Sequence, residues 1–481
     1  MAGNRTEHIV RFCEKEISIA EKNLNEPTTH GRAAGVDSRP GAAELRARRD
    51  RLAAAVGPGG VALIGAAPVP RRSTRFRQTN EFFYATGLEV PGAYVLVDGA
   101  DGTTTVYLPH RDEHRERQEG RGLWAEDTEL VRDRSGADHV QAVSDLPAEL
   151  GRRLFRGPLA VHTPFAPPEG ERETRDGLLG GTAARLTDPF GPREANGLRA
   201  ALAAHFPSIE AIDLTPVLDE LRLIKSDSEL AAMREAGRLT GQAVIEAMRS
   251  TEAGIFEYEL SAVADFVFGQ AGARGGSYEA IVATGTNAWH GHYVRKDTVL
   301  TDGELVLMDY APDLDYYTSD IGRMWPVSGR WEPWQLELYG FILRYHRALL
   351  ARIKPGVTAD EILDDTRAEL SEVLEATTWS APEFERAARG ALDFRGHLSH
   401  PVGMAVHDVG GYRGRPLQEG LVFSVDPMLW VPERNLYVRC EDTVAVTSDG
   451  IENLTGFVPL DPDEIEATIA EPGLLQYWRD R

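Results

Sequence analysis

The sequence predicts an α+β protein of two domains, the second of which carries antiparallel strands preceded by pairs of helices. A chain of 481 residues is too long for one hydrophobic core, since single cores stop growing near about 250–300 residues. Strand-like and helical segments alternate in residues 41–218, which indicates an α/β domain. In residues 219–481 two helical segments precede strand-like runs, and this order occurs twice. Residues 1–40 are expected to form an extension.

Composition and charge restrict the classes of partner. The chain is 42% hydrophobic and 26% charged, with a net charge of −23. This charge argues against nucleic acid or an anionic membrane as a partner, because both need a basic surface. No apolar run approaches the roughly 20 residues that span a bilayer, and the N-terminal segment has no apolar signal core. Only Cys13 and Cys440 occur, and Cys440 is expected to be a buried thiol, so we expect a cytoplasmic protein.

The expected N-terminal domain contains recognisable strands. They are GVALIGAAPVP, AYVLVDGADGTTTVYLP, in which an acidic glycine turn joins two strands, and LAVHTPF. The charge-dense segment 110–122 is expected to be a solvated loop or helix.

The C-terminal domain begins with a helix that has a clear start signal. Ser226 and Glu229 form a capping-box pattern, and apolar residues follow at helical spacing. The helical segment EYELSAVADFVFGQAG and the strand-like YEAIVATG come next. The order then recurs, with a second capping-box pattern at Thr358 and Glu361 and the strand-like runs LVFSVDPMLWV and LYVRCEDTVAVT at the end. This recurrence suggests an internal duplication of the architecture.

Five residues of this domain have side chains that bind metal ions, and each lies in or beside a short apolar, strand-like run. They are Asp309, Asp320, His400, Asp426 and Glu441. Four carboxylates cannot be gathered in a buried site without counter-charge, because each buried anion costs several kcal/mol unless it is paired or bound to metal. A pair of divalent cations supplies that charge, and the sequence therefore predicts a two-metal hydrolase.

The local patterns around the first three residues support this prediction. Asp309 ends an apolar run, and Asp320 follows the turn-like APDLD, so an antiparallel strand pair would carry both carboxylates. His400 lies in GHLSHPVGMAVHD between His397 and His407. Three histidines within one short segment, ahead of two more acid-bearing strands, favour ligation by His400.

The last two acids have informative neighbours. Pro427 follows Asp426 directly and interrupts regular strand pairing there. Alternation along YVRCEDTVAVT puts Arg439 and Glu441 on one face, so that Arg439 would hold the Glu441 carboxylate in place. The oxygen-rich set fits Mn²⁺, which is the expected ion, and also Co²⁺ or Zn²⁺. Two such ions roughly 3.5–4 Å apart would lower the pKa of a bridging water.

These segments resemble the pita-bread metallopeptidases, the family of Xaa-Pro aminopeptidase (aminopeptidase P), prolidase and methionine aminopeptidase. The resemblance covers about residues 45–460 and is closest to the aminopeptidase P and prolidase branch. It also rests on FRQTNEFFYATGLEVPGAYVLV (76–97), LRLIKSDSELAAMREAG (221–237) and IVATGTNAWHGHY (281–293). It implies a pita-bread catalytic domain behind a smaller, creatinase-like N-terminal domain, and assembly into a homodimer or homotetramer.

The resemblance also implies roles for individual residues. The five metal-binding positions of the family fall on the five residues named above. The substrate-binding histidine of the family falls on His292, and a histidine that contacts the scissile carbonyl falls on His407. Asp426 falls on a residue that is both ligand and proton shuttle.

The chain departs from its relatives at two places. Asp426 stands in Val-Asp-Pro where relatives carry Val-Glu-Pro, and the missing methylene shortens the reach by about 1.5 Å. Relatives have His-Gly ahead of the histidine ligand, whereas this chain has Gly396-His397, so His397 is a displaced candidate for a catalytic role.

The implied activity is that of a metal-dependent aminopeptidase that cleaves the Xaa-Pro bond of peptides whose second residue is proline. A metal-bridging hydroxide would attack the carbonyl polarised by metal and His407, Asp426 would carry the proton to the proline nitrogen, and His292 would orient the substrate. Two alternatives stay open. One is a hydrolase or lyase of this fold for a specialised small C–N substrate, and the other is a metal-bound, non-catalytic binding protein.

Overall fold

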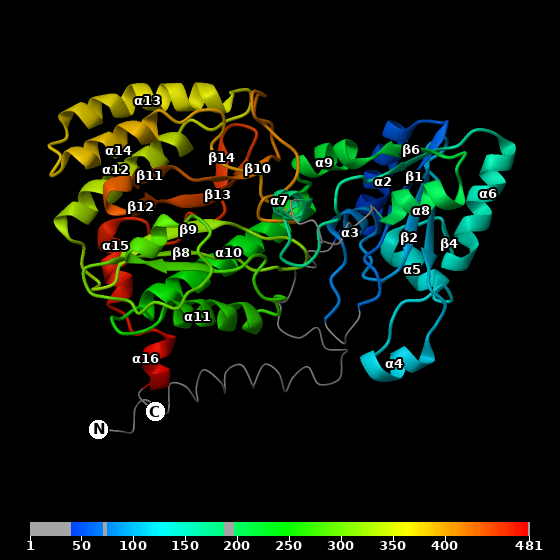
Figure 1. Ribbon diagram of the computed structural model, residues 1–481, viewed down its shortest axis with the longest axis horizontal. Coiled ribbons are helices and arrows are strands. Elements are labelled where there is room, and N and C mark those ends of the chain that lie inside the picture. The colour runs from blue at the N-terminus through cyan, green and yellow to red at the C-terminus, as the bar shows by residue number, and fades with distance from the viewer. Residues whose placement is uncertain (1–39, 71–74, 187–196, 480–481) are drawn as a thin grey trace.

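The computed structural model describes residues 40–70, 75–186 and 197–479, which form two lobes side by side (Figure 1). The expected extension lies outside the described residues except for Pro40, and so does Cys13. Within the described residues no helix is both long and apolar enough to cross a membrane.

The smaller lobe is an α/β layer structure, as the alternation of segments predicted. Its six-stranded sheet has the order β4-β3-β2-β1-β5-β6, with an antiparallel centre of β1 to β3 and parallel additions at both edges. The charge-dense segment contains the exposed helix α4. The bounds are α2 Ala42–Val56, β1 Gly60–Gly65, α3 Asn80–Thr86, β2 Tyr94–Asp98, β3 Thr104–Leu108, α4 Glu113–Glu119, α5 Thr128–Ser135, β4 His139–Ala142, α6 Leu146–Arg156, β5 Ala160–Thr163, α7 Arg175–Leu186, α8 Gly197–His205, β6 Glu210–Asp213 and α9 Thr215–Leu223.

The larger lobe is built on an antiparallel sheet of order β10-β13-β9-β8-β7, to which β14 adds at β13. In the view of Figure 1, α11 lies below the strands and α13 above them. The bounds are α10 Asp227–Arg249, α11 Glu257–Gln270, β7 Ile281–Thr284, η3 Gly285–Trp289, β8 Leu305–Asp309, β9 Ile321–Pro326, α12 Pro333–Leu350, α13 Ala359–Ala376, α14 Pro382–Leu392, β10 Val422–Val425, β11 Met428–Val431, β12 Leu436–Arg439, β13 Glu441–Val446, β14 Ile451–Asn453, α15 Pro462–Ile469 and α16 Leu474–Arg479.

The helix starts in this lobe follow their sequence signals. Both expected capping boxes form, with the Ser226 hydroxyl accepting from the Glu229 backbone N–H and the Thr358 hydroxyl from that of Glu361. Helix α14, which separates the second helix pair from the strands that follow, was not predicted, and neither were the C-terminal elements β14, α15 and α16. Helix α14 starts at Pro382, a residue that suits the first turn of a helix, and it buries Phe384.

The two strand-like runs near the C-terminus are each broken at a candidate site residue. The run LVFSVDPMLWV divides into β10 and β11 around Asp426 and Pro427, and the other run divides into β12 and β13 at Cys440. The pairing register is the same on both sides of the breaks, since Val425 pairs with Asp442 and Met428 with Arg439. This shared register places Asp426 opposite Glu441.

The two lobes share buried contacts. One hydrophobic cluster includes Phe82 and Phe83 of the smaller lobe together with Met233 and Val402 of the larger one. The ring of Phe83 stacks on that of Tyr316, with 3.5 Å between centroids. The lobes therefore pack against each other through buried side chains.

Candidate metal centre

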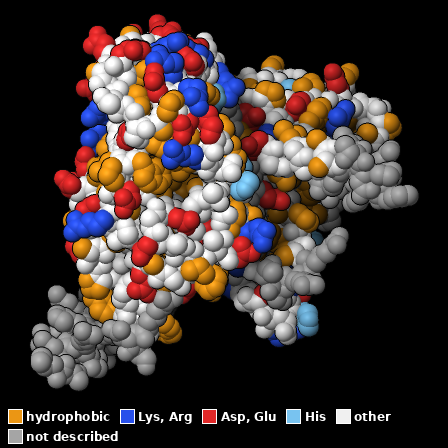
Figure 2. Space-filling model, turned by 60° about the vertical axis from the view of Figure 1, so that its left-hand side comes forward, with side chains coloured by type: hydrophobic (Ala, Val, Ile, Leu, Met, Phe, Trp, Pro, Cys, Tyr) orange, Lys and Arg blue, Asp and Glu red, His pale blue; other side chains and the backbone are white. Residues whose placement is uncertain are grey.

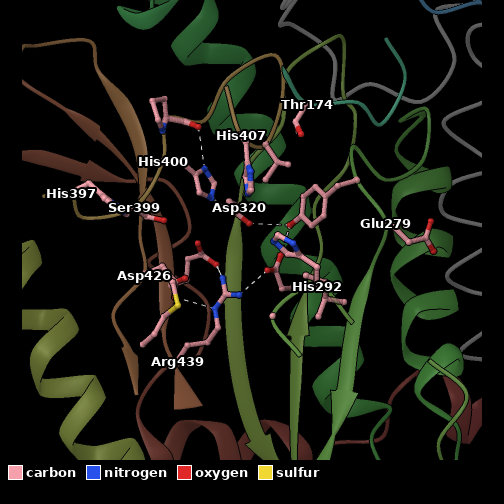
Figure 3. Close-up of a pocket in the computed structure, with 18 of the residues that line it drawn as sticks. Thr174, Glu279, His292, Asp320, His397, Ser399, His400, His407, Asp426 and Arg439 are labelled. Atoms are coloured by element: carbon pink, nitrogen blue, oxygen red, sulfur yellow. Dashed lines mark hydrogen bonds and ion pairs between the residues drawn. The ribbon is translucent and has the colours of Figure 1, made fainter. Parts of the chain in front are cut away.

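A cavity of about 900 Å³ gathers all of the predicted site residues in its lining. These are Asp309, Asp320, His400, Asp426, Glu441, Arg439, His292, His407 and His397. Figure 3 shows Asp320, His400 and His407 close together above Asp426 and Arg439.

Strand ends and strand register position the carboxylates. Asp309 is the last residue of β8, Asp320 directly precedes β9, and both Asp309 and Glu441 pair with Gly322 of β9. Gly322 leaves room for Arg439, because a Cβ at this glycine would lie 2.6 Å from Nε of Arg439. The missing side chain thus lets the guanidinium lie over the strand, among the carboxylates.

Arg439 connects three of the four acids. Its Nε donates to Oδ1 of Asp426 at 3.0 Å and its Nη1 to Oδ2 of Asp309 at 3.0 Å. Its Nη2 donates to the carboxylate of Glu441 in a short contact. The expected pairing of Arg439 with Glu441 is present, and it is one of three such bonds.

Asp320 forms a second group with His400 and Tyr278. Nε2 of His400 lies 3.3 Å from Oδ2 of Asp320. The hydroxyl of Tyr278 donates to Oδ1 of Asp309 at 2.6 Å and to Oδ1 of Asp320 at 3.1 Å. The backbone N–H of Asp320 donates to the hydroxyl of Thr443 at 2.8 Å. All four acids are therefore fixed by hydrogen bonds.

The electrostatics of the cavity show a surplus of negative charge. Burial, with the nearby Asp320 charge, raises the pKa of Asp309 to about 7. Burial also raises the pKa of Asp426 from 3.8, although Arg439 opposes this. Burial acts in the same direction on Asp320, but the hydrogen bond and charge of His400, together with the charge of Arg439, outweigh it and lower the pKa of Asp320. The single positive charge of the Arg439 guanidinium does not neutralise the charge of four buried carboxylates.

The residues present fit a divalent cation. Ligand atoms of Asp320, His400 and Glu441 lie within 4.8 Å of one another. Oε1 of Glu441 is buried and accepts no hydrogen bond from the described residues, so an anionic oxygen is left for a cation. Carboxylate oxygens and a neutral imidazole suit ions such as Mn²⁺, Co²⁺ and Zn²⁺.

Two further histidines face this group. The ring of His407 lies 4.1 Å from that of His400 and 5.9 Å from that of His292, centroid to centroid. Burial and the neighbouring His407 lower the pKa of His292. Nδ1 of His407 lies 2.7 Å from Oδ2 of Asp176, a residue of α7 in the smaller lobe. The smaller lobe thus contacts a site residue of the larger one.

A network of buried ion pairs fixes the residues that neighbour His407 and Asp176 in the sequence. Asp408, which follows His407, receives bonds from Arg222 and from Lys225. Arg222 also pairs with Glu169 of the smaller lobe. All four charged groups of this network are buried.

Arg175, which directly precedes Asp176, takes part in the same network of ion pairs. Its Nη2 lies 3.0 Å from Oε1 of Glu81 and 3.5 Å from Oε2 of Glu169. The charges of the two lobes therefore fix the start of α7 relative to the cavity.

His397 is placed apart from the other histidines. It lines the cavity, but its ring packs edge-on against Phe394, with 4.8 Å between centroids, and it lies at the far side in Figure 3. Burial, with the nearby charge of Arg413, lowers the pKa of His397. The structure brings it to the wall of the site and not to the carboxylate cluster.

Sequence reasoning missed two residues of this site. Tyr278 lies three residues before β7, and its neighbours in the sequence do not indicate that its hydroxyl bonds to the acids. Asp176 lies in the other lobe and contacts His407 across 231 positions of sequence. No local pattern in the sequence signals either contact.

Comparison with known proteins identifies the family. The model of metallopeptidase family M24 matches residues 231–448, and that of the aminopeptidase P N-terminal domain matches residues 45–160. The Xaa-Pro aminopeptidase of Escherichia coli K12 is 32% identical over 445 residues, covering 88% of this chain and 97% of the relative. Xaa-Pro aminopeptidase 3 of Mus musculus is 30% identical over 408 residues, covering 81% of this chain and 76% of the relative.

A solved structure agrees with these relatives. Zn-substituted E. coli aminopeptidase P in complex with product superimposes with a TM-score of 0.72 at 31% identity, covering 90% of this chain and 98% of that one. The predicted α+β fold, with a C-terminal pita-bread domain behind a smaller creatinase-like domain, is confirmed. With its acid-rich cavity and these matches along most of its length, the chain belongs to the M24 metallopeptidases, in their aminopeptidase P branch.

Proposed function

We propose that this chain is a metal-dependent aminopeptidase that hydrolyses the Xaa-Pro bond at the N-termini of peptides. The observation that carries the proposal is the convergence of four carboxylates and one imidazole on a single cavity, in a chain similar to an Xaa-Pro aminopeptidase over 88% of its length. The comparisons do not favour a specialised small C–N substrate or a non-catalytic binding role.

The metal would be held by the five predicted ligands, namely Asp309, Asp320, His400, Asp426 and Glu441. We expect two divalent ions, with Mn²⁺ as the preferred one. When bound, such ions supply Lewis acidity, which makes water nucleophilic near neutral pH and polarises a carbonyl. Arg439, which bridges three of the acids, would then orient the ligands without itself binding metal.

Asp426 would act as the proton carrier. Burial raises its pKa from 3.8, and a carboxylate whose pKa moves towards neutrality can both accept and release a proton. It would accept a proton from the attacking water and deliver it to the nitrogen of the departing proline.

His407 would stabilise the carbonyl oxygen as it gains negative charge. With Nδ1 facing Asp176, the other ring nitrogen, Nε2, would be the atom that contacts that oxygen. His292, beside His407, would orient the peptide.

The test is mass-spectrometric hydrolysis of Ala-Pro-Ala and Ala-Ala-Ala by the Mn²⁺-loaded protein. We expect release of alanine from the proline peptide only. Asp426→Asn keeps the shape but not the proton carrier, and should lose on the order of a hundredfold in kcat. Asp302→Asn, at an exposed position, is the matched control and should keep full activity. Equal cleavage of both peptides, or full activity of Asp426→Asn, would refute the proposal.

Three further expectations belong to this proposal. The chain would assemble into a homodimer or homotetramer, which sedimentation analysis can test. It would work in the cytoplasm, and the free, buried thiol of Cys440 supports a reducing compartment. Residues 41–218 and 219–481 would form separate domains, connected through α9.

A further inference from the structure

The segment that carries His400 lies beside β10, the edge strand of the larger sheet. The backbone C=O of Leu398 accepts from the N–H of Asp426 at 3.2 Å, and the C=O of His400 accepts from the N–H of Ser424 at 3.0 Å. These two bonds hold one side of the segment. The backbone N–H groups of Leu398 and Ser399 need other partners, because few backbone donors inside a protein stay unpaired.

One tyrosine hydroxyl satisfies both of these N–H groups. Oη of Tyr412 accepts from the N–H of Leu398 at 3.1 Å and from that of Ser399 at 3.2 Å. It donates to the C=O of Ser399 at 2.8 Å. A hydroxyl has one donor and two acceptor positions, so these bonds use its full capacity. Burial raises the pKa of Tyr412 to about 12, which keeps the hydroxyl protonated and able to donate.

The same stretch of chain also holds the residue that follows His400. The backbone N–H of Asp408 donates to the C=O of Pro401 at 2.9 Å. Residues 408–412 therefore bond to the chain on both sides of His400. Figure 3 shows the rings of His400 and His407 close together at this point. The stretch that follows His407 thus supports the segment that carries His400.

Residues 408–412 are themselves firmly held. The buried ion pairs described above fix Asp408. Gly410 has a φ of +86°, and a Cβ there would lie 3.0 Å from the backbone oxygen of Asp219 in α9. The stretch therefore packs closely on α9, at a position that favours glycine. The ring of Tyr412 packs on that of Phe423 in β10, with 4.9 Å between centroids.

Tyr412 acts from inside the protein. The cavity has lining residues from both lobes, and Figure 2 shows a histidine side chain at the surface where the lobes meet. Tyr412 also lines the cavity but is only 3% exposed. All the bonding positions of its hydroxyl are used by the chain itself, so this hydroxyl holds its neighbours and does not bind substrate.

We infer that Tyr412 is a positioning residue of the metal centre, whose hydroxyl fixes the backbone that carries the His400 ligand. This inference rests on the proposed metal-dependent activity. Ligand atoms must lie within about 0.2 Å of their preferred distance from an ion. Without the hydroxyl, the N–H groups of Leu398 and Ser399 lose their partner, and the imidazole of His400 is held less precisely.

The test is a calorimetric titration of Mn²⁺ into the full chain after its metal has been removed with a chelator. Tyr412→Phe keeps the ring that packs on Phe423 and removes only the hydroxyl. Groups that orient metal ligands contribute about 10–100-fold to metal affinity. The Kd of Tyr412→Phe for Mn²⁺ should therefore be at least about tenfold higher than that of the wild type.

The matched control is Thr86→Val, at the end of α3 in the smaller lobe. The buried hydroxyl of Thr86 donates to the C=O of Phe82 at 2.8 Å and accepts from the N–H of Leu88 at 3.2 Å. The change removes a hydroxyl with the same kinds of partner, at a residue that does not line the cavity. Thr86→Val should keep the Kd of the wild type.

Hydrogen–deuterium exchange of the metal-free wild type is a second measurement, which does not depend on the folding of a variant. The amides of Leu398 and Ser399 should exchange as slowly as those of Ser424 and Asp426, which bond to the same segment. Rapid exchange of the first two amides would overturn the inference.

The titration separates this inference from the proposed function. An unchanged Kd in Tyr412→Phe, or an equal loss of affinity in Thr86→Val, would overturn the role of Tyr412 while leaving the proposed function intact. Failure of the wild type to bind Mn²⁺, Co²⁺ or Zn²⁺ would refute the proposed metal centre, and the role of Tyr412 with it.

Discussion

The most direct test of the ionic network behind the site is the replacement of Glu81 by glutamine. Glu81 is 2% exposed, and its Oε2 is buried without a hydrogen-bond partner among the described residues. Burial, followed by the charge of Glu169, raises the pKa of Glu81 from 4.5 to about 7. A glutamine has nearly the same shape, can still accept from Arg175, and does not ionise.

The sign of the effect follows from proton linkage. Because the folded-state pKa of Glu81 exceeds its unfolded value of 4.5, folding favours the protonated carboxyl group. The stability that this contributes is complete below pH 4.5 and is lost as the pH rises through about 7. At 1.36 kcal/mol for each pKa unit, the ionised side chain costs about 3 kcal/mol at pH 8.

We expect Glu81→Gln to be more stable than wild type, by an amount that increases with pH. Its free energy of unfolding, relative to wild type, should rise by about 2–3 kcal/mol between pH 5 and pH 8. Urea denaturation at several pH values measures this difference through the midpoint and the m-value. Glu113→Gln, at a position whose side chain is 81% exposed, is the control and should follow the wild-type curve. Parallel curves for wild type and Glu81→Gln would refute the reasoning.

Three changes at the site itself have equally definite outcomes. Arg439→Lys keeps one positive charge but cannot bridge three carboxylates, so metal titration should show affinity about 10–100-fold lower. Tyr278→Phe removes the hydroxyl shared by Asp309 and Asp320, and the same titration should show a loss of about tenfold with little change in folding. Asp176→Asn should lower kcat by at least about tenfold with little change in KM, because the neutral amide removes the negative charge beside Nδ1 of His407; a KM effect alone would contradict this role.

The acids of the centre could be found in the sequence because strand-like apolar runs lead to them. Asp309 ends β8 and Glu441 begins β13, so a local pattern of buried residues marks both positions. Of the breaks in the two C-terminal strand-like runs, only the one at Pro427 could be anticipated, because proline has no backbone N–H donor. Cys440 carries no comparable signal, and the second break follows from the pairing of β12 and β13 with different partners.

The remaining features depend on packing between distant segments. The bonds of Tyr278 to the acids span 31 and 42 positions, and the bond of Asp176 to His407 spans 231. Helix α14 was missed because a proline in the segment TTWSAPEF resembles a loop signal as much as a helix start. The metal ligands could be predicted as a set, but which groups orient them could be learned only from the fold.

The unbroken register on either side of Asp426 and Glu441 has a consequence for variation among homologous chains. Side chains alternate between the faces of a strand, so one residue inserted or deleted in β10 to β13 would turn an acid away from the centre. A change of side-chain length, such as aspartate for glutamate, leaves the alternation intact. Tolerated differences in length should therefore be confined to the turn at residues 432–435, where Asn435 adopts a left-handed conformation outside both ladders.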